Sequence, residues 1–491
     1  MERSAGILLP VFSLPGAYGI GTLGREARAF ADFLRDAGQR WWQVLPVGPT
    51  GAGNSPYTSA STFAGNPLLI DLEDLRDRGL LTEAELSAAR VEPDGPIDYA
   101  ALYACREPLL RRAFSRLSGT EAQAVRDFAA ANPWLEAYAL YRALKTHFGE
   151  TAWYDWPDKA LRDHDPAALE PWRAELAEDI AFHEAVQCWF FAQWKALKDH
   201  TNGLGVGIIG DLPIYVSLDS ADVWSERKEF LLDETGKPSR VAGVPPDYFS
   251  EEGQLWGNPL YDWAAMKQDG FGWWIRRVEG ASRLFDAIRI DHFRAFERYW
   301  SVPAGAESAK EGQWEKGPGM DLLGVLTNWF PHITYIAEDL GLLTPEVHQL
   351  REAAGLPGMK VLEFAFDHPG NAYLPHNYDS RRCVCYTGTH DNDTALGWYD
   401  HAPETERAFA ERYLGASGRE EVRKALLRCG MGSTAELFVA QMQDYLALGS
   451  EGRINVPGVA EGNWRWRMAP GAATAALAAE IRALTETYGR C

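Results

Sequence analysis

The sequence predicts an α/β protein with a mainly parallel sheet, and two observations lead to this prediction. Short apolar runs of strand length alternate along the chain with amphipathic helical patterns. Acidic residues stand at the ends of several of these runs and not at their starts, namely Asp211, Asp291, Glu338 and Asp391. Repeated βα units form either a (β/α)8 barrel or a doubly wound sheet, and in both the chemistry collects at the carboxyl ends of the strands.

The expected elements follow from the spacing of the apolar residues. A helix is predicted over residues 22–38, because Leu23, Ala27, Phe30 and Leu34 fall on one face. Another is predicted over residues 344–354, with Thr344 as its cap, Pro345 in its first turn and Gly355 as its stop. Strands are expected within the segments RWWQVLPV, VGIIGDLPIYV, FDAIRIDHFRAF, YIAEDLG, MKVLEFAF and CVCYTGTHD.

Two segments interrupt the alternation. Residues 72–150 are almost wholly helical in pattern, and residues 217–274 are rich in Pro, Gly and aromatic residues. We interpret the first as a helical insertion and the second as an irregular loop insertion over the active site. A chain of 491 residues has room for three modest domains or for one large one. We predict a single catalytic domain over residues 1–491.

Composition and charge exclude several classes of protein. Forty-eight basic residues against 69 acidic ones give a net charge of −21, so neither nucleic acid nor an anionic membrane is an expected partner. Residues 1–14 contain an apolar stretch that is broken by Pro10 and lacks a cleavage site, which does not fit a signal peptide. Six cysteines are too few for a disulfide framework. We therefore predict a cytoplasmic protein.

Two short motifs suggest cofactor or metal sites only superficially. The glycines of GVGIIG, residues 205–210, match a dinucleotide fingerprint, but they precede an apolar strand instead of following one. A helix stop and turn is the preferred interpretation. Cys383 and Cys385 fall on one face of an expected strand without a second ligand cluster nearby, so we expect two buried thiols. Neither an organic cofactor nor a metal is predicted.

The stretch DAIRIDHFRAF, residues 286–296, places charged residues in a strand that otherwise has a buried pattern. Side chains alternate along a strand, so Arg289 and Asp291 share the face opposite to Ile288 and Ile290. An arginine one strand step before an aspartate can keep that carboxylate ionised.

Asp291, Glu338 and Asp391 form a set of acids at separate strand ends. Acids brought into one pocket repel each other and raise at least one pKa. Two carboxylates about 5–5.5 Å apart are what retaining exchange of a glycosidic bond requires, one as nucleophile and one as acid. We assign Asp291 to the first role and Glu338 to the second. The 19 tryptophans, many in loops, suit ligands with apolar ring faces.

The chain resembles the 4-α-glucanotransferases of the amylomaltase (disproportionating enzyme) type, which are related to the α-amylase clan. The matching stretches occur in order from the N-terminus to about Arg467: SLPGAYGIGTLG, WWQVLPVGPTG, NSPYTSASTFAGNPLLIDL, GDLPIYV, WGNPLYDW, RIDHFRAF, AEDLG, GLPGMKVLEFAF, LPHNY, YTGTHDNDT and NWRWR. The resemblance implies a (β/α)8 barrel with insertions and no separate C-terminal β-domain.

The resemblance also implies roles for individual residues. Asp291 matches the nucleophile, Glu338 the general acid/base, and Asp391 the acid that grips sugar hydroxyls beside His390. The implied substrate-binding residues are Tyr57, Asp211, Trp256, Arg289, His390 and Asn463, and we add His292 as a candidate. His292 and His390 each follow a strand-end residue and would point away from that neighbour, which argues against a metal pair.

The implied reaction transfers a segment of an α-1,4-glucan to the 4-hydroxyl of a second glucan or of glucose, so the expected partners are maltooligosaccharides, longer α-1,4-glucans and glucose as acceptor. Two alternatives stay open from the residues alone: a retaining hydrolase of α-glucans, and a glucan-binding protein without activity. The oligomeric state cannot be read from the sequence.

Overall fold

The computed structural model describes residues 2–92, 95–246, 251–341 and 343–491. Within these residues eight parallel strands form one sheet in the order β10-β11-β12-β1-β2-β3-β6-β9. Their bounds are β1 Ser4–Leu8, β2 Trp41–Gln43, β3 Gly207–Leu212, β6 Ala287–Ile290, β9 Thr334–Ala337, β10 Gly358–Val361, β11 Cys383–Tyr386 and β12 Leu437–Gln441. The backbone N–H of Ala337 donates to the carbonyl of Pro357 at 2.9 Å and brings the two outer strands, β9 and β10, together. The sheet is therefore a nearly closed (β/α)8 barrel, as predicted.

The six segments expected to contain strands all do, and two further strands, β1 and β12, lie outside these segments. β1 has the sequence SAGIL and β12 the sequence LFVAQ, and every residue in both strands is buried. They pair with each other over five residues, from Ser4 with Leu437 to Leu8 with Gln441. Strands this short that are covered on both faces carry no period-two pattern, so only their partners identify them.

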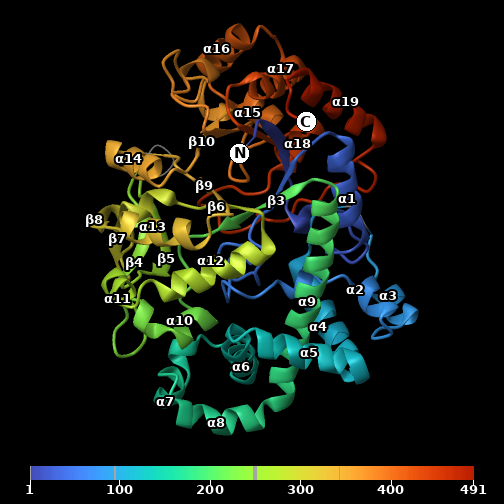
Figure 1. Ribbon diagram of the computed structural model, residues 1–491, viewed down its shortest axis with the longest axis vertical. Coiled ribbons are helices and arrows are strands. Elements are labelled where there is room, and N and C mark those ends of the chain that lie inside the picture. The colour runs from blue at the N-terminus through green and yellow to red at the C-terminus, as the bar shows by residue number, and fades with distance from the viewer. Residues whose placement is uncertain (1, 93–94, 247–250, 342) are drawn as a thin grey trace.

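Helices of the repeating βα units cover the outside of the barrel (Figure 1). α1, Arg25–Asp36, buries Ala27, Phe30 and Leu34 as predicted, although it begins only after Gly24. α14, Pro345–Ala353, follows Thr344 at the cap position. The remaining helices of this outer layer are α12 Gly272–Leu284, α13 Gly319–Trp329, α15 Ala395–His401, α16 Glu404–Leu414, α17 Arg419–Gly432 and α19 Ala475–Thr487.

A second group of helices lies between β2 and β3 in the sequence and forms the lower part of the molecule in Figure 1. These helices are α2 Leu72–Asp77, α3 Glu83–Ala89, α4 Tyr99–Ser115, α5 Gly119–Ala131, α6 Trp134–His147, α7 Lys159–Arg162, α8 Pro166–Glu175 and α9 Ala177–Gly203. The helical chain thus continues past residue 150 until α9 returns to the barrel. Gly205, with φ of 77°, reverses the chain before β3 begins at Gly207. The helix stop and turn expected for GVGIIG is confirmed.

The segment 217–274 is more regular than expected. It contains α10 Ala221–Ser225, β4 Arg240–Val244, β5 Gln254–Pro259 and α11 Trp263–Gln268, while residues 247–250 lie outside the described part. β4 pairs in antiparallel fashion with β5 and with β7, Arg298–Pro303, which in turn pairs with β8, Gln313–Lys316. Half of this small sheet comes from a later part of the chain, so the pattern within residues 217–274 could not show it. The boundaries of both insertions remain predictions.

The two ends of the described chain lie close together at one side of the barrel (Figure 1). The guanidinium of the buried Arg490 donates to the backbone carbonyls of Ser4 and Met431, at 2.9 and 2.7 Å. Residues 442–491 form α18, Met442–Tyr445, then α19, and contain no strand. Of the helices that the structure describes, none is both long and apolar enough to span a membrane.

Candidate active site

Neighbouring strands β3 and β6 place an ion pair inside the barrel. Asp211 and Arg289 are direct partners in the parallel register, so their side chains point to the same face. The Nη1 atom of Arg289 lies 2.7 Å from Asp211 Oδ2 and 2.9 Å from Asp291 Oδ1. Arg289 and Asp211 are almost wholly buried, whereas the Asp291 side chain is 27% exposed. A buried cation thus holds one buried carboxylate and one that a ligand can reach.

Tyr57 fixes the other side of this group. Its hydroxyl donates to Asp211 Oδ2 at 2.9 Å, and its backbone N–H donates to Ser55 Oγ at 3.2 Å. Burial, followed by the negative charge of Asp211, raises the pKa of Tyr57 well above its ordinary value. The phenol is therefore a hydrogen-bond donor at all ordinary pH values. Asp211 accepts from Tyr57 and Arg289 at once, which satisfies a carboxylate that water cannot reach.

Glu338 follows β9 directly and lies beside Asp291. Its Oε2 accepts from the backbone N–H of His292 at 2.8 Å, and its Oε1 accepts from the N–H of Leu340 at 3.0 Å. The pKa of Glu338 is raised to about 8 overall: burial raises it most and the negative charge of Asp291 adds to this, whereas the Arg289 cation and the two N–H groups lower it. Glu338 is therefore largely protonated at neutral pH.

His292 connects Asp291 to Glu338 through an unusual backbone conformation. Its φ of 47° and ψ of 49° are left-handed, a conformation that costs a non-glycine residue of order 1 kcal/mol or more. In this conformation its N–H points at Glu338. Burial lowers the pKa of the imidazole to about 4, so the ring is neutral at pH 7. The indole of Trp256 meets this ring edge to face at a centroid distance of 4.8 Å.

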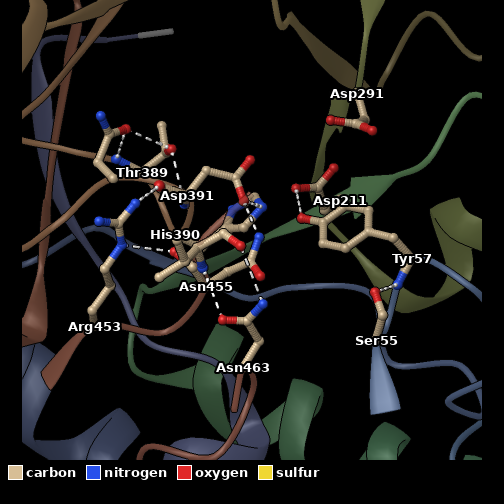
Figure 2. A network of polar contacts seen from close by, with 12 residues as sticks. Ser55, Tyr57, Asp211, Asp291, Thr389, His390, Asp391, Arg453, Asn455 and Asn463 are labelled. Carbon is tan, nitrogen blue, oxygen red and sulfur yellow. Dashed lines mark hydrogen bonds and ion pairs between the residues drawn. The ribbon is translucent and has the colours of Figure 1, made fainter. Parts of the chain in front are cut away.

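Asp391 lies on the loop that follows β11 and is held from a different part of the chain. Its Oδ1 accepts from Asn455 Nδ2 at 2.6 Å, and its backbone carbonyl accepts from Arg453 at 2.7 Å. The other oxygen and much of the carboxylate are open, since the side chain is 44% exposed. Figure 2 shows Asp391 with His390, Arg453 and Asn455 on one side of the site, facing Asp211, Asp291 and Tyr57 on the other.

The loop carrying Asp391 is braced at both ends. The buried carboxylate of Asp444 accepts from the Thr387 hydroxyl at 2.5 Å and from the backbone N–H of Ala395 at 2.7 Å. Between these points, Asn392 accepts from both the N–H and the hydroxyl of Thr389, at 3.0 and 2.8 Å. The loop of Asp391 is thus anchored to the segment that follows β12 as well as to its own strand.

Aromatic rings join the two sides. The Tyr57 ring stacks on the His390 imidazole at a centroid distance of 5.1 Å, and Trp464 lies against both rings, at 5.8 and 6.0 Å. Tyr57 therefore contacts the Asp211 side through its hydroxyl and the Asp391 side through its ring. Rings beside carboxylates form a surface suited to the flat apolar faces and polar rims of sugars.

Trp256 and Asn463, two further predicted binding residues, occupy different settings. Trp256 lies on β5 and is 36% exposed beside His292. Asn463 uses its side-chain amide to close its own loop, since Oδ1 accepts from Val456 N and Nδ2 donates to the carbonyls of Val456 and Val459. Its predicted contact with substrate would require one of these bonds to be shared or exchanged.

The two cysteines that could have suggested a metal site are ordinary buried residues. Cys383 and Cys385 are buried free thiols on β11, as expected. In the described part of the chain, no group of three or more His, Cys, Asp or Glu side chains is arranged to hold a metal ion.

Sequence reasoning did not find Arg453, Asn455 or Trp464, although all three contact predicted site residues. Asn455 and Trp464 flank the turn VPGVAEGN, and Trp464 has a left-handed backbone with φ of 62°. The Pro-Gly and Gly-Asn pairs signal a turn, but nothing local indicates that the turn meets the loop after β11.

These features define a class: a (β/α)8 enzyme scaffold with acids at its strand ends, one paired with a buried arginine and one kept protonated beside it. Residues 9–474 match the model of the 4-alpha-glucanotransferase family, and the chain belongs to that family. It is 51% identical to a 4-alpha-glucanotransferase from Thermus thermophilus, over 100% of this chain and 99% of that protein. A Streptococcus pneumoniae 4-alpha-glucanotransferase is 44% identical over 100% of this chain and 98% of its own. The structure of an amylomaltase from Streptococcus agalactiae in complex with acarbose matches with a TM-score of 0.97 at 38% identity, covering 100% of both chains.

Proposed function

We propose that this enzyme transfers a segment of an α-1,4-glucan to the 4-hydroxyl of another glucan or of glucose by double displacement. The observation that carries the proposal is the contrast between two neighbouring carboxylates. Asp291 has a cation partner in Arg289, at 2.9 Å, while burial keeps Glu338 protonated. A nucleophile and an acid are thus present together before substrate arrives.

In the first step a carboxylate oxygen of Asp291 attacks the anomeric carbon. The bond from that carbon to the glycosidic oxygen breaks, and Glu338 gives its proton to the departing oxygen. In the second step the ionised Glu338 takes the proton of the acceptor 4-hydroxyl, whose oxygen attacks the anomeric carbon and releases Asp291. Two inversions restore the α-configuration, and Glu338 ends protonated as it began.

The other residues position the sugar. Asp391, braced by Asn455 at 2.6 Å, has an exposed oxygen that can accept from sugar hydroxyls in the bound and distorted states. Asp211 and Arg289 orient the nucleophile, and His390 can hydrogen-bond to the same sugar. Tyr57 and His292 offer ring surfaces to the donor chain, Trp256 offers one to the acceptor sugar, and Asn463 would also meet the acceptor.

Transfer rather than hydrolysis requires the acceptor to compete with water. Trp256 on β5 is exposed beside His292, next to the nucleophile and the acid. A bound sugar stacked there would raise the effective concentration of the acceptor hydroxyl and exclude water. Maltooligosaccharides, longer α-1,4-glucans of the starch and glycogen type, and glucose as acceptor are the proposed substrates. A cytoplasmic location remains our proposal, in keeping with the sparse and unpaired cysteines.

The product pattern from maltotriose tests the proposal. A transferase yields glucose together with maltooligosaccharides longer than the substrate, whereas a hydrolase yields glucose and maltose only. We expect the ladder of longer products from the wild type and from Glu352→Gln, a control on the exposed side of α14. Glu338→Gln should give no ladder. A ladder from Glu338→Gln equal to that of the wild type would contradict the acid/base assignment, and maltose and glucose alone from the wild type would favour the hydrolase.

A further inference from the structure

A second cavity lies outside the active site, where the loop after β2 meets the helices α4, α6 and α9. Its volume is about 530 Å³, within the range of cavities that hold small organic ligands. Its walls include Arg106 of α4, Arg142 of α6 and His183 of α9, and none of the predicted catalytic acids. α9 packs against both α4 and α6 in the lower part of Figure 1.

Arg106 is the unusual residue in this wall. Its side chain is only 3% exposed, yet among the residues that the structure describes it has no ion-pair partner within 4 Å. Nη1 donates to the carbonyl of Ile70 at 3.0 Å, whereas the buried Nη2 has no hydrogen-bond partner in the described chain. Asp71 acts on this guanidinium only at longer range. A buried cation without a counter-ion is costly, so an anion in the cavity would complete the arrangement.

Burial lowers the pKa of Arg106 to about 10, which still leaves the guanidinium charged at neutral pH. The two carboxylates of the same wall already have partners. Glu107 accepts from Arg111 at 3.0 Å, and Glu150 accepts from both Nη atoms of Arg142, at 3.2 and 3.3 Å. They therefore leave the charge of Arg106 uncompensated.

His183 supplies a second unused polar atom. Its Nε2 is buried without a hydrogen-bond partner in the described residues. Burial, helped by the cations of Arg142 and Arg111, lowers the pKa of His183 well below its ordinary value, so the ring is neutral. In the tautomer with the proton on Nε2, it can donate to an anionic oxygen.

We propose that this cavity binds a small phosphate-bearing anion, toward which the side chains of Arg106 and His183 turn their unpartnered Nη2 and Nε2 atoms as donors to the phosphate oxygens. The guanidinium fork suits tetrahedral and planar oxyanions, and charge-assisted bonds of this kind are among the stronger ones in proteins. The cavity is larger than a free phosphate ion needs, and its apolar wall, with Leu68, Phe182 and Val186, can cover the body of a phosphorylated sugar. This site is independent of the proposed transfer chemistry.

Isothermal titration calorimetry of the full chain at pH 7 tests the site, with glucose 6-phosphate, inorganic phosphate and glucose as separate titrants. The variants are Arg106→Gln and, as a matched control, Arg428→Gln on the exposed surface of α17. We expect one glucose 6-phosphate per wild-type or Arg428→Gln chain, and affinity at least about tenfold weaker in Arg106→Gln, the loss of one charge-assisted hydrogen bond. Any heat from glucose itself, which reports on the active site, should be the same in all three proteins.

The two phosphate titrants distinguish the sources of the anion. Tighter binding of glucose 6-phosphate than of inorganic phosphate identifies a sugar phosphate as the ligand, and equal binding identifies the free ion. Unchanged glucose 6-phosphate affinity in Arg106→Gln, or no binding of either phosphate to the wild type up to about 10 mM, would overturn the proposal. If Arg106→Gln does not fold, wild-type crystals soaked in glucose 6-phosphate decide: we expect phosphate density beside Arg106 Nη2, and an empty cavity contradicts the site.

Discussion

The surroundings of Glu338 explain why this residue can act as the acid of the reaction. It sits next to a cation and accepts two backbone hydrogen bonds, all of which favour its charged form, yet burial outweighs them and raises its pKa to about 8. The result is a carboxylic acid that stays protonated where most glutamates have lost their proton, which is what protonation of a departing sugar oxygen needs.

The pH dependence of the reaction should report this pKa. Since the acid must be protonated in the free enzyme, kcat/KM for maltotriose should fall as the pH rises through about 8. Rates measured between pH 5 and 10 check this, with Glu352→Gln as control. An alkaline limb that begins below about pH 6 would contradict the protonated state of Glu338.

The same pKa predicts a change in stability. The folded state holds the Glu338 proton more tightly than the unfolded chain, so the free energy of unfolding contributed by this residue falls as the pH rises from about 4.5 to about 8. Glu338→Gln removes that loss. The free energy of unfolding of Glu338→Gln minus that of the wild type should therefore be larger at pH 8.5 than at pH 5, by roughly 2–4 kcal/mol at most. Urea unfolding at both pH values measures it, and an equal difference at both would be inconsistent with the raised pKa.

Arg289 is predicted to contribute both to the stability of the fold and to the transfer reaction. Arg289→Met leaves the buried Asp211 carboxylate without its cation, so we expect a loss of about 3–5 kcal/mol in the free energy of unfolding, along with loss of transfer activity. Arg428→Met, an exposed control, should change neither.

A double variant separates the two effects of Arg289. Adding Asp211→Asn to Arg289→Met removes the unpaired charge, so stability should return in part while activity stays lost, because Asp291 still lacks its partner. Recovery of activity in the double variant would show that Arg289 acts only on stability.

At the scale of elements, the site is assembled from two halves. Strands β3, β6 and β9 present Asp211, Arg289, Asp291 and Glu338, while the loops after β11 and β12 present Asp391 and its partners. Parallel strands end at one edge, so residues at their carboxyl ends meet without any local signal linking them. This is why the strand-end acids could be predicted from the sequence.

What the sequence did not reveal depends on contacts between distant segments. Asn455 and Arg453 brace Asp391 from more than sixty residues away, and the small sheet joins β4 and β5 to β7 and β8 across α11, α12 and β6. β1 and β12 are short and wholly buried, which removes the alternation that identifies a strand. The left-handed conformation of His292 is set by tertiary contacts, since nothing in its own side chain requires it.

Two asparagines of the loop after β12, Asn455 and Asn463, have different contacts and should have different effects on the kinetics. Asn455→Ala removes the 2.6 Å bond to Asp391, so kcat for maltotriose should fall by about tenfold, the value of one hydrogen bond to a charged group. Asn463→Ala loosens only the turn of residues 456–463 and should mainly raise KM for the glucose acceptor. Steady-state kinetics with both substrates measures both effects; a larger loss of kcat in Asn463→Ala than in Asn455→Ala would reverse the assignment.

Trp256 on β5 should decide how well sugars compete with water. Trp256→Ala should increase the share of hydrolysis among products severalfold, because the proposed stacking surface for a bound sugar beside His292 is lost, while Trp256→Phe, which keeps a ring, should change it less. Quantifying reducing ends against chain-length redistribution gives the ratio. An unchanged ratio of hydrolysis to transfer in Trp256→Ala would show that Trp256 does not protect the intermediate from water.

At the scale of the whole molecule, a nearly closed barrel carries all the predicted catalytic side chains at one end, and the helices between β2 and β3 form a helical body that packs against it and shares its core. The net charge of −21 agrees with a neutral glucan substrate, which needs no electrostatic attraction. The cavity beside Arg106 lies between that helical body and the loop after β2, so a phosphate-bearing ligand there would contact the loop that also carries Tyr57 without occupying the place of the predicted catalytic acids.

The central claim is that Asp291 forms the covalent bond to the sugar while Glu338 serves as its acid and base. Incubating the enzyme with 5-fluoro-α-glucosyl fluoride, digesting it and mapping the modified peptide by mass spectrometry tests this directly. We predict one fluoroglucosyl group per chain, attached to Asp291 within the peptide that contains residues 287–296, and no label in Asp291→Asn. A label on Asp391, Glu338 or any residue other than Asp291 would contradict the account.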